Sequence, residues 1–198
     1  MKIQVILGSS REGRAIVPVG KWVAKAAAEI EGFEVETVDL RDYDLPMFNE
    51  AISPRFNPER KLDEKTKPFL DKLAEADGYI FITPEYNHSI SGVLKNALDY
   101  LTWELKKKPA AIVSYGGVGG ARAAEHLKAI LIESRAAIVP EATTLNFDVF
   151  QAISADGHLP AAPLANPRGP QSSLTTSLTE LAWWTATLKA GRAENPTV

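Results

Sequence analysis

Residues 2–14 of the chain read KIQVILGSSREGR, and this stretch decides the fold. Residues 2–7 form a short apolar run that is typical of a buried strand in a parallel sheet. A polar turn with two glycines follows at residues 8–14. Pro18 then suits the first turn of a helix, where its missing N–H is not needed. The helix is amphipathic, because apolar side chains recur at helical spacing: Val19, Trp22, Val23, Ala26, Ala27 and Ile30.

The same alternation of apolar runs and helical periods continues along the chain and predicts a parallel α/β sheet. Further strands are expected at residues 33–40, 79–83, 110–115 and 136–139, the last one broken or shifted at Pro140. Helices are expected at residues 59–76 and 92–106, after the glycines at 116–120, and at 173–190. Together these elements predict a doubly wound, five-stranded parallel sheet of strand order 2-1-3-4-5 with helices on both faces.

We expect one domain over residues 1–198, because the length of 198 residues falls short of two ordinary domains. Residues 156–171 carry four prolines and two glycines. This segment is expected to be a proline-rich loop before the last helix, and either a mobile surface loop or a segment that wraps another subunit.

Composition excludes several classes of function. The chain is 45% hydrophobic and 24% charged, which is typical of a soluble globular protein. It has no cysteine, so disulfides, thiolate nucleophiles and cysteine-ligated metals are excluded, and its three histidines show no metal-ligand spacing. The net charge of -3 argues against nucleic acid or an anionic membrane as a partner. Without a targeting segment or a long apolar span, we expect a cytoplasmic protein.

Three loops of unusual composition leave the ends of the first, third and fourth expected strands. We call them loop 1 (residues 8–14), loop 2 (residues 83–92) and loop 3 (residues 114–122). In open α/β sheets, ligands bind beyond the carboxyl ends of the strands, where the winding direction reverses. The expected strand order places the three loops around one such point, so we expect them to form a common site.

Loop 1 has the residues of an anion site. Backbone N–H groups, a helix N-terminus and the guanidinium groups of Arg11 and Arg14 favour a phosphomonoester, and Ser9 adds a hydroxyl. The alternative is an ordinary helix cap with solvated arginines. A triphosphate P-loop is excluded because Arg14 and Ala15 stand where that motif needs lysine followed by serine or threonine.

Loops 2 and 3 suit a flat ligand. Tyr86 can line a heterocycle and the Asn87 amide can serve its donor and acceptor edges, although these residue types also form ordinary turns. A role of His88 as acid or base is a minor alternative. Loop 3 has four glycines, which permit close approach of a ligand to the backbone. It matches a dinucleotide fingerprint only loosely.

These motifs together resemble the NAD(P)H-dependent FMN reductase family, which has a flavodoxin-like fold and includes quinone and azo-dye reductases. The resemblance covers about residues 1–134, whereas the segment after Phe147 matches no pattern of the family. Ser91 stands where many relatives have proline, and serine also caps helices. The resemblance implies FMN and NADPH (or NADH) as cofactors. It implies these FMN-binding residues: Ser9, Arg11, Gly13, Arg14, Ala15, Ile16, Pro84, Glu85, Tyr86, Asn87, Tyr115, Gly116 and Gly117.

The resemblance also implies the reaction: hydride passes from NAD(P)H to the flavin N5 and then to a quinone, a flavin or a similar small acceptor. No catalytic side chain is expected, because the flavin carries the chemistry. A flavodoxin-type electron carrier and a flavin-free α/β regulator are the alternatives. Two arginines in loop 1 and the near-neutral charge favour the enzyme. Trp103, Trp183, Trp184 and the proline-rich segment suggest self-association, expected as a homodimer or homotetramer, and core packing is the alternative explanation of the tryptophans.

Overall fold

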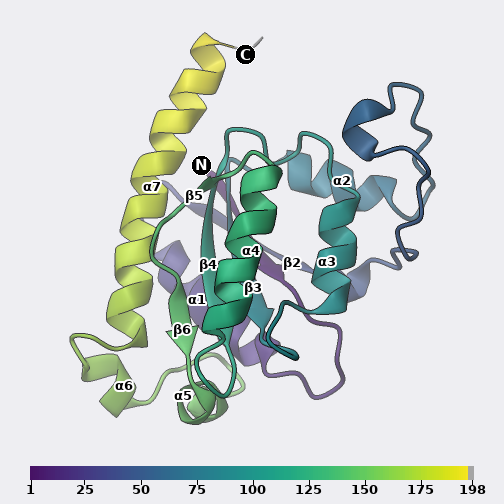
Figure 1. Ribbon diagram of the computed structural model, residues 1–198. Helices are drawn as coiled ribbons and strands as arrows, with labels where there is room; N and C mark the ends of the chain where they lie inside the picture. The colour runs from purple at the N-terminus through teal and green to yellow at the C-terminus, as the bar shows by residue number, and fades with distance from the viewer. Residues whose placement is uncertain (196–198) are drawn as a thin grey trace.

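The structure, a computed structural model, describes residues 1–195 and is built on one parallel sheet (Figure 1). The sheet order is β2-β1-β3-β4-β5, and a sixth strand also pairs with β4. This confirms the predicted order 2-1-3-4-5. The strands are β1 (Lys2–Leu7), β2 (Glu34–Asp39), β3 (Gly78–Pro84), β4 (Pro109–Tyr115), β5 (Ala137–Ile138) and β6 (Thr143–Leu145).

The fifth strand position is shared by two short strands, as the sequence predicted from Pro140. β5 pairs with the first residues of β4, where Ala137 lies opposite Pro109. β6 pairs with the last residues of β4, where Thr143 lies opposite Val113. Pro140 lies between them and has no N–H to donate to a ladder, which explains why pairing stops there.

The helices differ from the sequence predictions at their ends, and two short helices, α5 and α6, were not expected. α2 and α3 are shorter than expected, α7 is longer, and residues 156–171 are not wholly a loop, because they contain α6 and the start of α7. Before α2, the Asp63 carboxylate accepts the N–H groups of Lys65 and Thr66, which forms a turn instead of helix. The helices are α1 (Ile16–Ala28), α2 (Lys67–Ala74), α3 (Gly92–Asp99), α4 (Ala121–Glu133), α5 (Phe147–Ala152), α6 (Ala161–Ala165) and α7 (Pro170–Glu194), with 3-10 turns η1 (Leu40–Asp42) and η2 (Pro54–Phe56).

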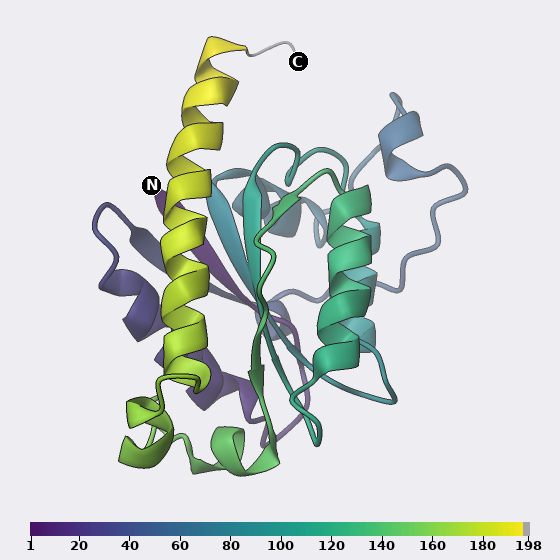
Figure 2. The same cartoon turned by 60° about the vertical axis from the view of Figure 1, so that its left-hand side comes forward.

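Helices cover both faces of the sheet (Figures 1 and 2). α1 and α7 pack on one face, and α2, α3 and α4 pack on the other. Successive side chains of a strand alternate between the faces, so Val5 and Leu7 contact the first layer while Ile6 contacts the second. All three are buried, and burial of each such side chain contributes roughly 1.5–3 kcal/mol.

α7 joins the C-terminal part of the chain to the first helix. The Trp22 indole N–H donates to the Gln171 side chain at 2.8 Å, which ties α1 to the start of α7. Trp183, farther along α7, is 63% exposed and contacts the Trp184 ring edge-on. Among the described residues, no helix has the length and apolar character needed to cross a bilayer.

Substitution of Gly120 should test how loop 3 is held. Gly120 has φ +75°, and a Cβ there would lie 2.7 Å from the Tyr115 nitrogen. Gly13 has φ +59° but open space around the same position, so it is a matched control. We expect Gly13→Ala to lower the free energy of unfolding by about 1–2 kcal/mol. Gly120→Ala should cost roughly 1–3 kcal/mol more through steric overlap.

Urea denaturation of the purified protein measures both values. Equal losses in the two variants would show that the backbone around Tyr115 relaxes without cost.

Candidate functional site

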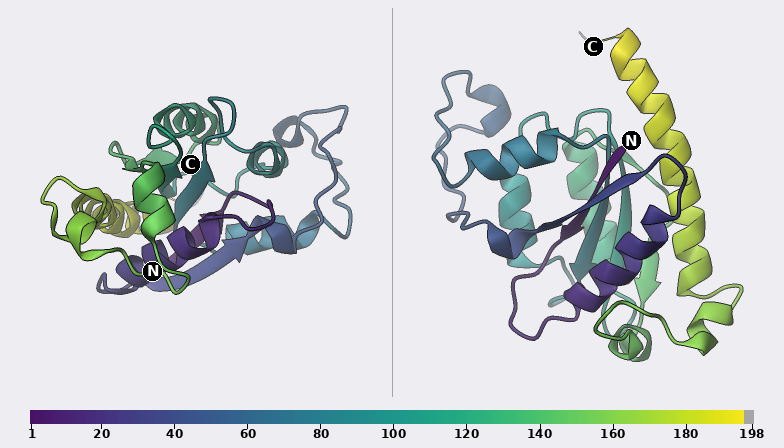
Figure 3. Two further views of the ribbon diagram at one scale, coloured as in Figure 1. Left: turned by 90° about the horizontal axis from the view of Figure 1, so that it is seen from below. Right: turned by 180° about the vertical axis from the view of Figure 1, so that it is seen from behind.

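The three loops leave neighbouring strands at the same edge of the sheet. β1, β3 and β4 are adjacent and parallel, so their carboxyl ends point the same way. This is the lower edge in Figure 1, and the left panel of Figure 3 views the molecule from it.

At the start of loop 1, the backbone of Gly8 lies very close to the backbone of β3. The Gly8 N–H donates to the Ile82 carbonyl at 2.9 Å, and a Cβ on Gly8 would lie 2.7 Å from that oxygen. The Ser91 hydroxyl donates to the Gly8 carbonyl, and its oxygen accepts the Leu94 N–H at 3.2 Å as the N-cap of α3. The predicted capping role of Ser91 is confirmed, and the same hydroxyl also fixes loop 1 against α3.

Loops 1 and 2 meet at Tyr86. Its hydroxyl shares a hydrogen bond with the buried Ser9 hydroxyl at 3.0 Å. The Arg11 guanidinium lies over the Tyr86 ring, 5.4 Å from its centroid, and remains exposed to solvent. A guanidinium at this distance is attracted by the electrons of the ring face. The tyrosine therefore holds the arginine at the mouth of loop 1.

Arg14 is engaged within the protein. Its guanidinium forms a two-pronged ion pair with Asp39, the last residue of β2, and also donates to the Ser9 carbonyl. Its Nε–H is buried and has no acceptor among residues 1–195. The side chain is only 7% exposed, so its clearest contribution is to fix the shape of loop 1. Asp39 has no local sequence signal that marks it as the partner of Arg14, 25 positions away.

The remainder of the expected phosphate turn lies at the start of α1. Gly13 has φ +59°, and Ala15 is the N-cap of α1 without a side-chain hydrogen bond. Ile16, the first residue of the helix, is fully buried. The first N–H groups of such a helix lack partners within the helix and are available to an anion.

Loop 2 contains a tight, strained turn. Tyr86 and Ser89 exchange two backbone hydrogen bonds, and the two residues between them, Asn87 and His88, have φ of +48° and +69°. Asparagine and histidine are both enriched among the few non-glycine residues that adopt this left-handed region. Both side chains are exposed. Backbone strain of this kind costs about 1–3 kcal/mol per residue and concentrates at functional sites.

The turn is also held from α4. The Ser89 hydroxyl oxygen lies 2.7 Å from Nδ1 of His126. The sequence points to His88 and not to His126, because the pairing of His126 joins residues 37 positions apart.

Loops 2 and 3 are joined by an ion pair between Glu85 and Arg122. The Arg122 Nε donates to the Glu85 carboxylate at 2.7 Å, and the Arg122 backbone N–H donates to it at 3.2 Å. Burial alone would raise the pKa of Glu85, but the hydrogen bonds and the charge of Arg122 outweigh it and hold that pKa below its usual value. Glu85 therefore caps α4 and fixes loop 2 against loop 3.

The glycines of loop 3 are required for different structural reasons. Gly119 and Gly120 have positive φ, and the Ser114 hydroxyl donates to the Gly119 carbonyl at 3.0 Å. A Cβ on Gly116 would lie 3.1 Å from the Cβ of Glu85, so this glycine permits close approach of loop 2. Gly117 is exposed, and a Cβ there would meet nothing within 4 Å. Only Gly117 thus leaves open space in front of the backbone.

Pro84 and Tyr115, two further predicted residues, contribute mainly backbone at this edge. They lie opposite each other in the β3–β4 ladder, and both are buried. The Tyr115 carbonyl accepts the Glu85 N–H at 2.8 Å, while its ring packs on Phe150 at 5.0 Å between centroids. Burial raises the pKa of the Tyr115 hydroxyl, so it stays neutral across the physiological range.

Replacing Glu85 should test the clamp between loops 2 and 3 through its pH dependence. A lowered pKa in the folded state stabilises the fold at pH values above the unfolded pKa, about 4.5, and this contribution disappears as the pH falls below it. We expect Glu85→Gln to cost about 1 kcal/mol at neutral pH. The difference from the unmodified protein should shrink toward pH 3.

Thermal or urea denaturation across this range measures the effect. Glu125→Gln is the control, because Glu125 pairs with Lys128 on the same helix and is 71% exposed. A Glu85→Gln difference that is constant with pH would contradict the ion-pair explanation.

Residues 1–149 match the family described as NADPH-dependent FMN reductase. An NAD(P)H-dependent FMN reductase of Schizosaccharomyces pombe is 40% identical over 149 residues, which are 74% of each chain. An NAD(P)H:quinone oxidoreductase of Solanum tuberosum is 35% identical over 141 residues, which are 66% of each chain.

A solved structure agrees with the fold over nearly the full length. It is a flavoenzyme NAD(P)H:(acceptor) oxidoreductase from Paracoccus denitrificans, with a TM-score of 0.71 and 26% identity, covering 94% of this chain and 97% of that one. The sheet order, the sequence relatives and the family match are consistent with one another. The chain belongs to the NADPH-dependent FMN reductase family and is an NAD(P)H-dependent FMN or quinone reductase-type enzyme with a flavodoxin-like fold.

Proposed function

We propose that loops 1, 2 and 3 bind FMN and that the protein uses NADPH or NADH to reduce quinones or similar small acceptors. The observation that carries this proposal is the contact of Tyr86 with both Ser9 and Arg11, since it unites the expected phosphate and ring sites. The quinone class is supported by the Solanum tuberosum relative, which is named a quinone oxidoreductase.

The phosphate would lie at loop 1. Arg11 is the exposed guanidinium there, whereas Arg14 is paired with Asp39. The open start of α1 would supply backbone N–H groups from the turn at residues 13–16, and the Arg14 Nε–H is a further, buried donor without a partner among residues 1–195. Because burying an unsatisfied donor is costly, an anion at this loop would stabilise it. Arg14 would therefore act mainly by holding the loop in shape, with the Ser9 hydroxyl fixing its start.

The flavin ring would lie between loops 2 and 3. Tyr86 and Asn87 would line it, and the open space before Gly117 would admit its polar edge to the backbone of Gly116 and Gly117. Pro84, Glu85 and Tyr115 would support this wall through their backbone and through the Arg122 clamp. The bound flavin would supply the hydride-accepting ring.

Self-association as a homodimer or homotetramer belongs to the same proposal. Trp103 and Trp183 are 48% and 63% exposed, and exposed aromatic side chains are common in subunit interfaces. A cytoplasmic location remains a prediction from the sequence.

Arg11 should matter for flavin retention. We expect Arg11→Ala to weaken FMN binding by about 1.5–3 kcal/mol, because it removes a charge-assisted contact to the phosphate. Arg11→Lys should lose less, since it retains the charge but not the planar donor group. Fluorescence titration of the apoprotein with FMN measures the Kd.

Riboflavin serves as the matched ligand, because it lacks the phosphate. The two variants should bind riboflavin as the unmodified protein does. If Arg11→Ala retains full affinity for FMN, the phosphate assignment is wrong.

The reaction itself is tested by the visible spectrum of the FMN-loaded protein before and after anaerobic addition of NADPH or NADH. Bleaching of the flavin bands and steady-state quinone reduction without any partner protein are the expected results. Flavin that binds but is not reduced would favour an electron carrier. A protein that takes up no FMN would favour a flavin-free regulator.

A further inference from the structure

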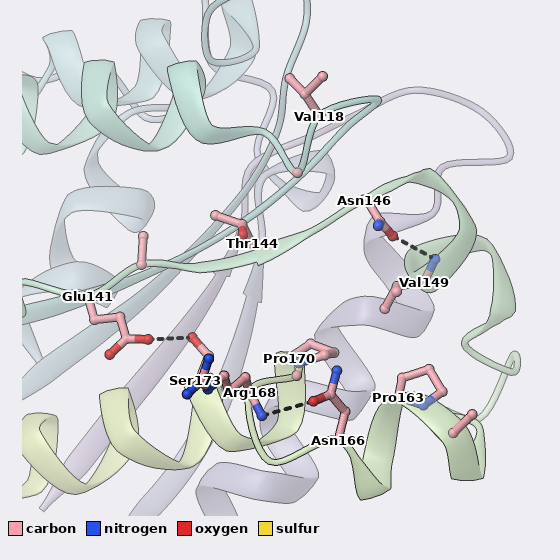
Figure 4. Close-up of a pocket in the computed structure, with 14 residues that line it drawn as sticks. Val118, Glu141, Thr144, Asn146, Val149, Pro163, Asn166, Arg168, Pro170 and Ser173 are labelled. Atoms are coloured by element: carbon pink, nitrogen blue, oxygen red, sulfur yellow. Dashed lines mark hydrogen bonds between the residues drawn. The ribbon is translucent and has the colours of Figure 1, made fainter.

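A cavity of about 700 Å³ lies beside the proposed flavin site (Figure 4). Its lining residues come from loop 3, β6, α5 and the corner between α6 and α7. Val118 and Gly119 of loop 3 form part of the wall, directly after Gly116 and Gly117. The proposed flavin site and the cavity therefore share loop 3 as a common wall. None of the residues assigned to FMN lines this cavity.

The wall that loop 3 provides is firmly seated. A Cβ on Gly119 would lie 3.1 Å from the Thr144 Cβ, so the loop packs directly against β6. Apolar side chains on other elements, such as Val149 on α5 and Pro163 on α6, line the same space. The cavity thus combines apolar surface for a flat group with charged side chains near its rim, which is the usual character of a small-molecule site.

Arg168 is the cation in this cavity. Its side chain is exposed, and its guanidinium makes no ion pair or hydrogen bond with any residue in the range 1–195. Its backbone is well fixed, because the Asn166 side chain accepts the Arg168 N–H at 3.0 Å. The next residue, Gly169, lies in a corner so tight that a Cβ would be 2.8 Å from the Pro163 carbonyl. An arginine free of internal partners is thus held at the edge of the cavity.

Glu141 is the anion in the same cavity. One of its carboxylate oxygens accepts the Ser173 hydroxyl at 3.1 Å, and its backbone carbonyl accepts the Ser177 hydroxyl at 2.8 Å. In dinucleotide sites, a carboxylate accepts the 2′-hydroxyl of the adenosine ribose in NADH, whereas an arginine accommodates the 2′-phosphate of NADPH. This cavity offers both groups, and both line it together with apolar surface.

We propose that the cavity receives the adenosine half of the nicotinamide cofactor. Arg168 binds the 2′-phosphate of NADPH, and Glu141 favours the 2′-hydroxyl of NADH and repels that phosphate. The opposite charges let one cavity accept either cofactor while loop 3 separates the adenosine from the flavin. This inference rests on the proposed function, because the nicotinamide end must reach the flavin.

The kinetic test compares NADPH and NADH in the FMN-loaded enzyme with Arg168→Ala and Glu141→Gln. We expect Arg168→Ala to lower kcat/KM for NADPH about tenfold or more while NADH changes little. Glu141→Gln should have the opposite effect and raise kcat/KM for NADPH relative to kcat/KM for NADH. Arg41→Ala is the matched control, because Arg41 is also exposed but lines a different cavity beside Ser10.

A binding test needs no redox step. Calorimetric titration of the FMN-loaded protein with adenosine 2′,5′-bisphosphate and with 5′-AMP should show tighter binding of the bisphosphate. Arg168→Ala should abolish that difference, and Arg41→Ala should leave it intact.

The outcomes separate the two proposals. If the unmodified enzyme oxidises NAD(P)H but Arg168→Ala alters neither the cofactor ratio nor fragment binding, the cavity assignment is wrong. The same holds if Arg41→Ala produces the loss. If the unmodified protein oxidises neither cofactor, the proposed function fails, while the titration still decides whether Arg168 binds the 2′-phosphate.

Discussion

The adjacency of three parallel strands is the constraint on which the rest of this structure depends. β1, β3 and β4 are hydrogen-bonded neighbours, so the loops that follow them leave one edge within reach of each other. The core on both faces enforces this register, because a slip of one residue would turn Ile6 and Val5 to the wrong layers. The position of the site is therefore a consequence of core packing.

Charge distribution then decides which groups at this edge remain available. Asp39 neutralises Arg14, and Glu85 neutralises Arg122, in both cases by contacts that also fix a loop. Arg11 has an aromatic ring beside it instead of a carboxylate. Arginines that the sequence does not distinguish thus have different physical roles. Arg14 and Arg122 hold the backbone of their loops, whereas Arg11 faces solvent. The same distinction sets Arg168 apart from the paired arginines elsewhere on the surface.

Sequence reasoning was most successful where the signal was local. The strand order follows from the alternation of apolar runs with helical periods, and Pro140 marks the break between β5 and β6 because it cannot donate to a ladder. The signal for the capping role of Ser91 was also local, because serine directly precedes the helix that it caps. The predicted start of α2 at residue 59 was wrong, because the Asp63 side chain forms a turn there that competes with the helix. The sequence did not predict α6, because this helix has only five residues and lies within a proline-rich segment.

Pairings between distant residues could not be predicted in this way. The neighbouring sequence does not indicate that Asp39 pairs with Arg14 or that Arg122 pairs with Glu85. Each ion pair forms only when the strands are assembled into the sheet. The same applies to Ser89 and His126, which lie on a loop and a helix that meet in space. A sequence pattern locates the loops, whereas the contacts within the site require the tertiary structure.

The length of α7 has a consequence for how the end of the molecule is held. Its 25 residues extend about 37 Å, while the seven residues of β4 extend about 23 Å, so the helix projects past the sheet (Figures 1 and 2). Lys189 binds Asp77 at 2.7 Å, and Arg192 donates to the Lys107 carbonyl at 2.6 Å. Added salt screens the exposed Lys189–Asp77 ion pair but leaves the apolar packing intact. Fraying of this projecting tip should thus increase with ionic strength, whereas the packed layers beneath it should respond little.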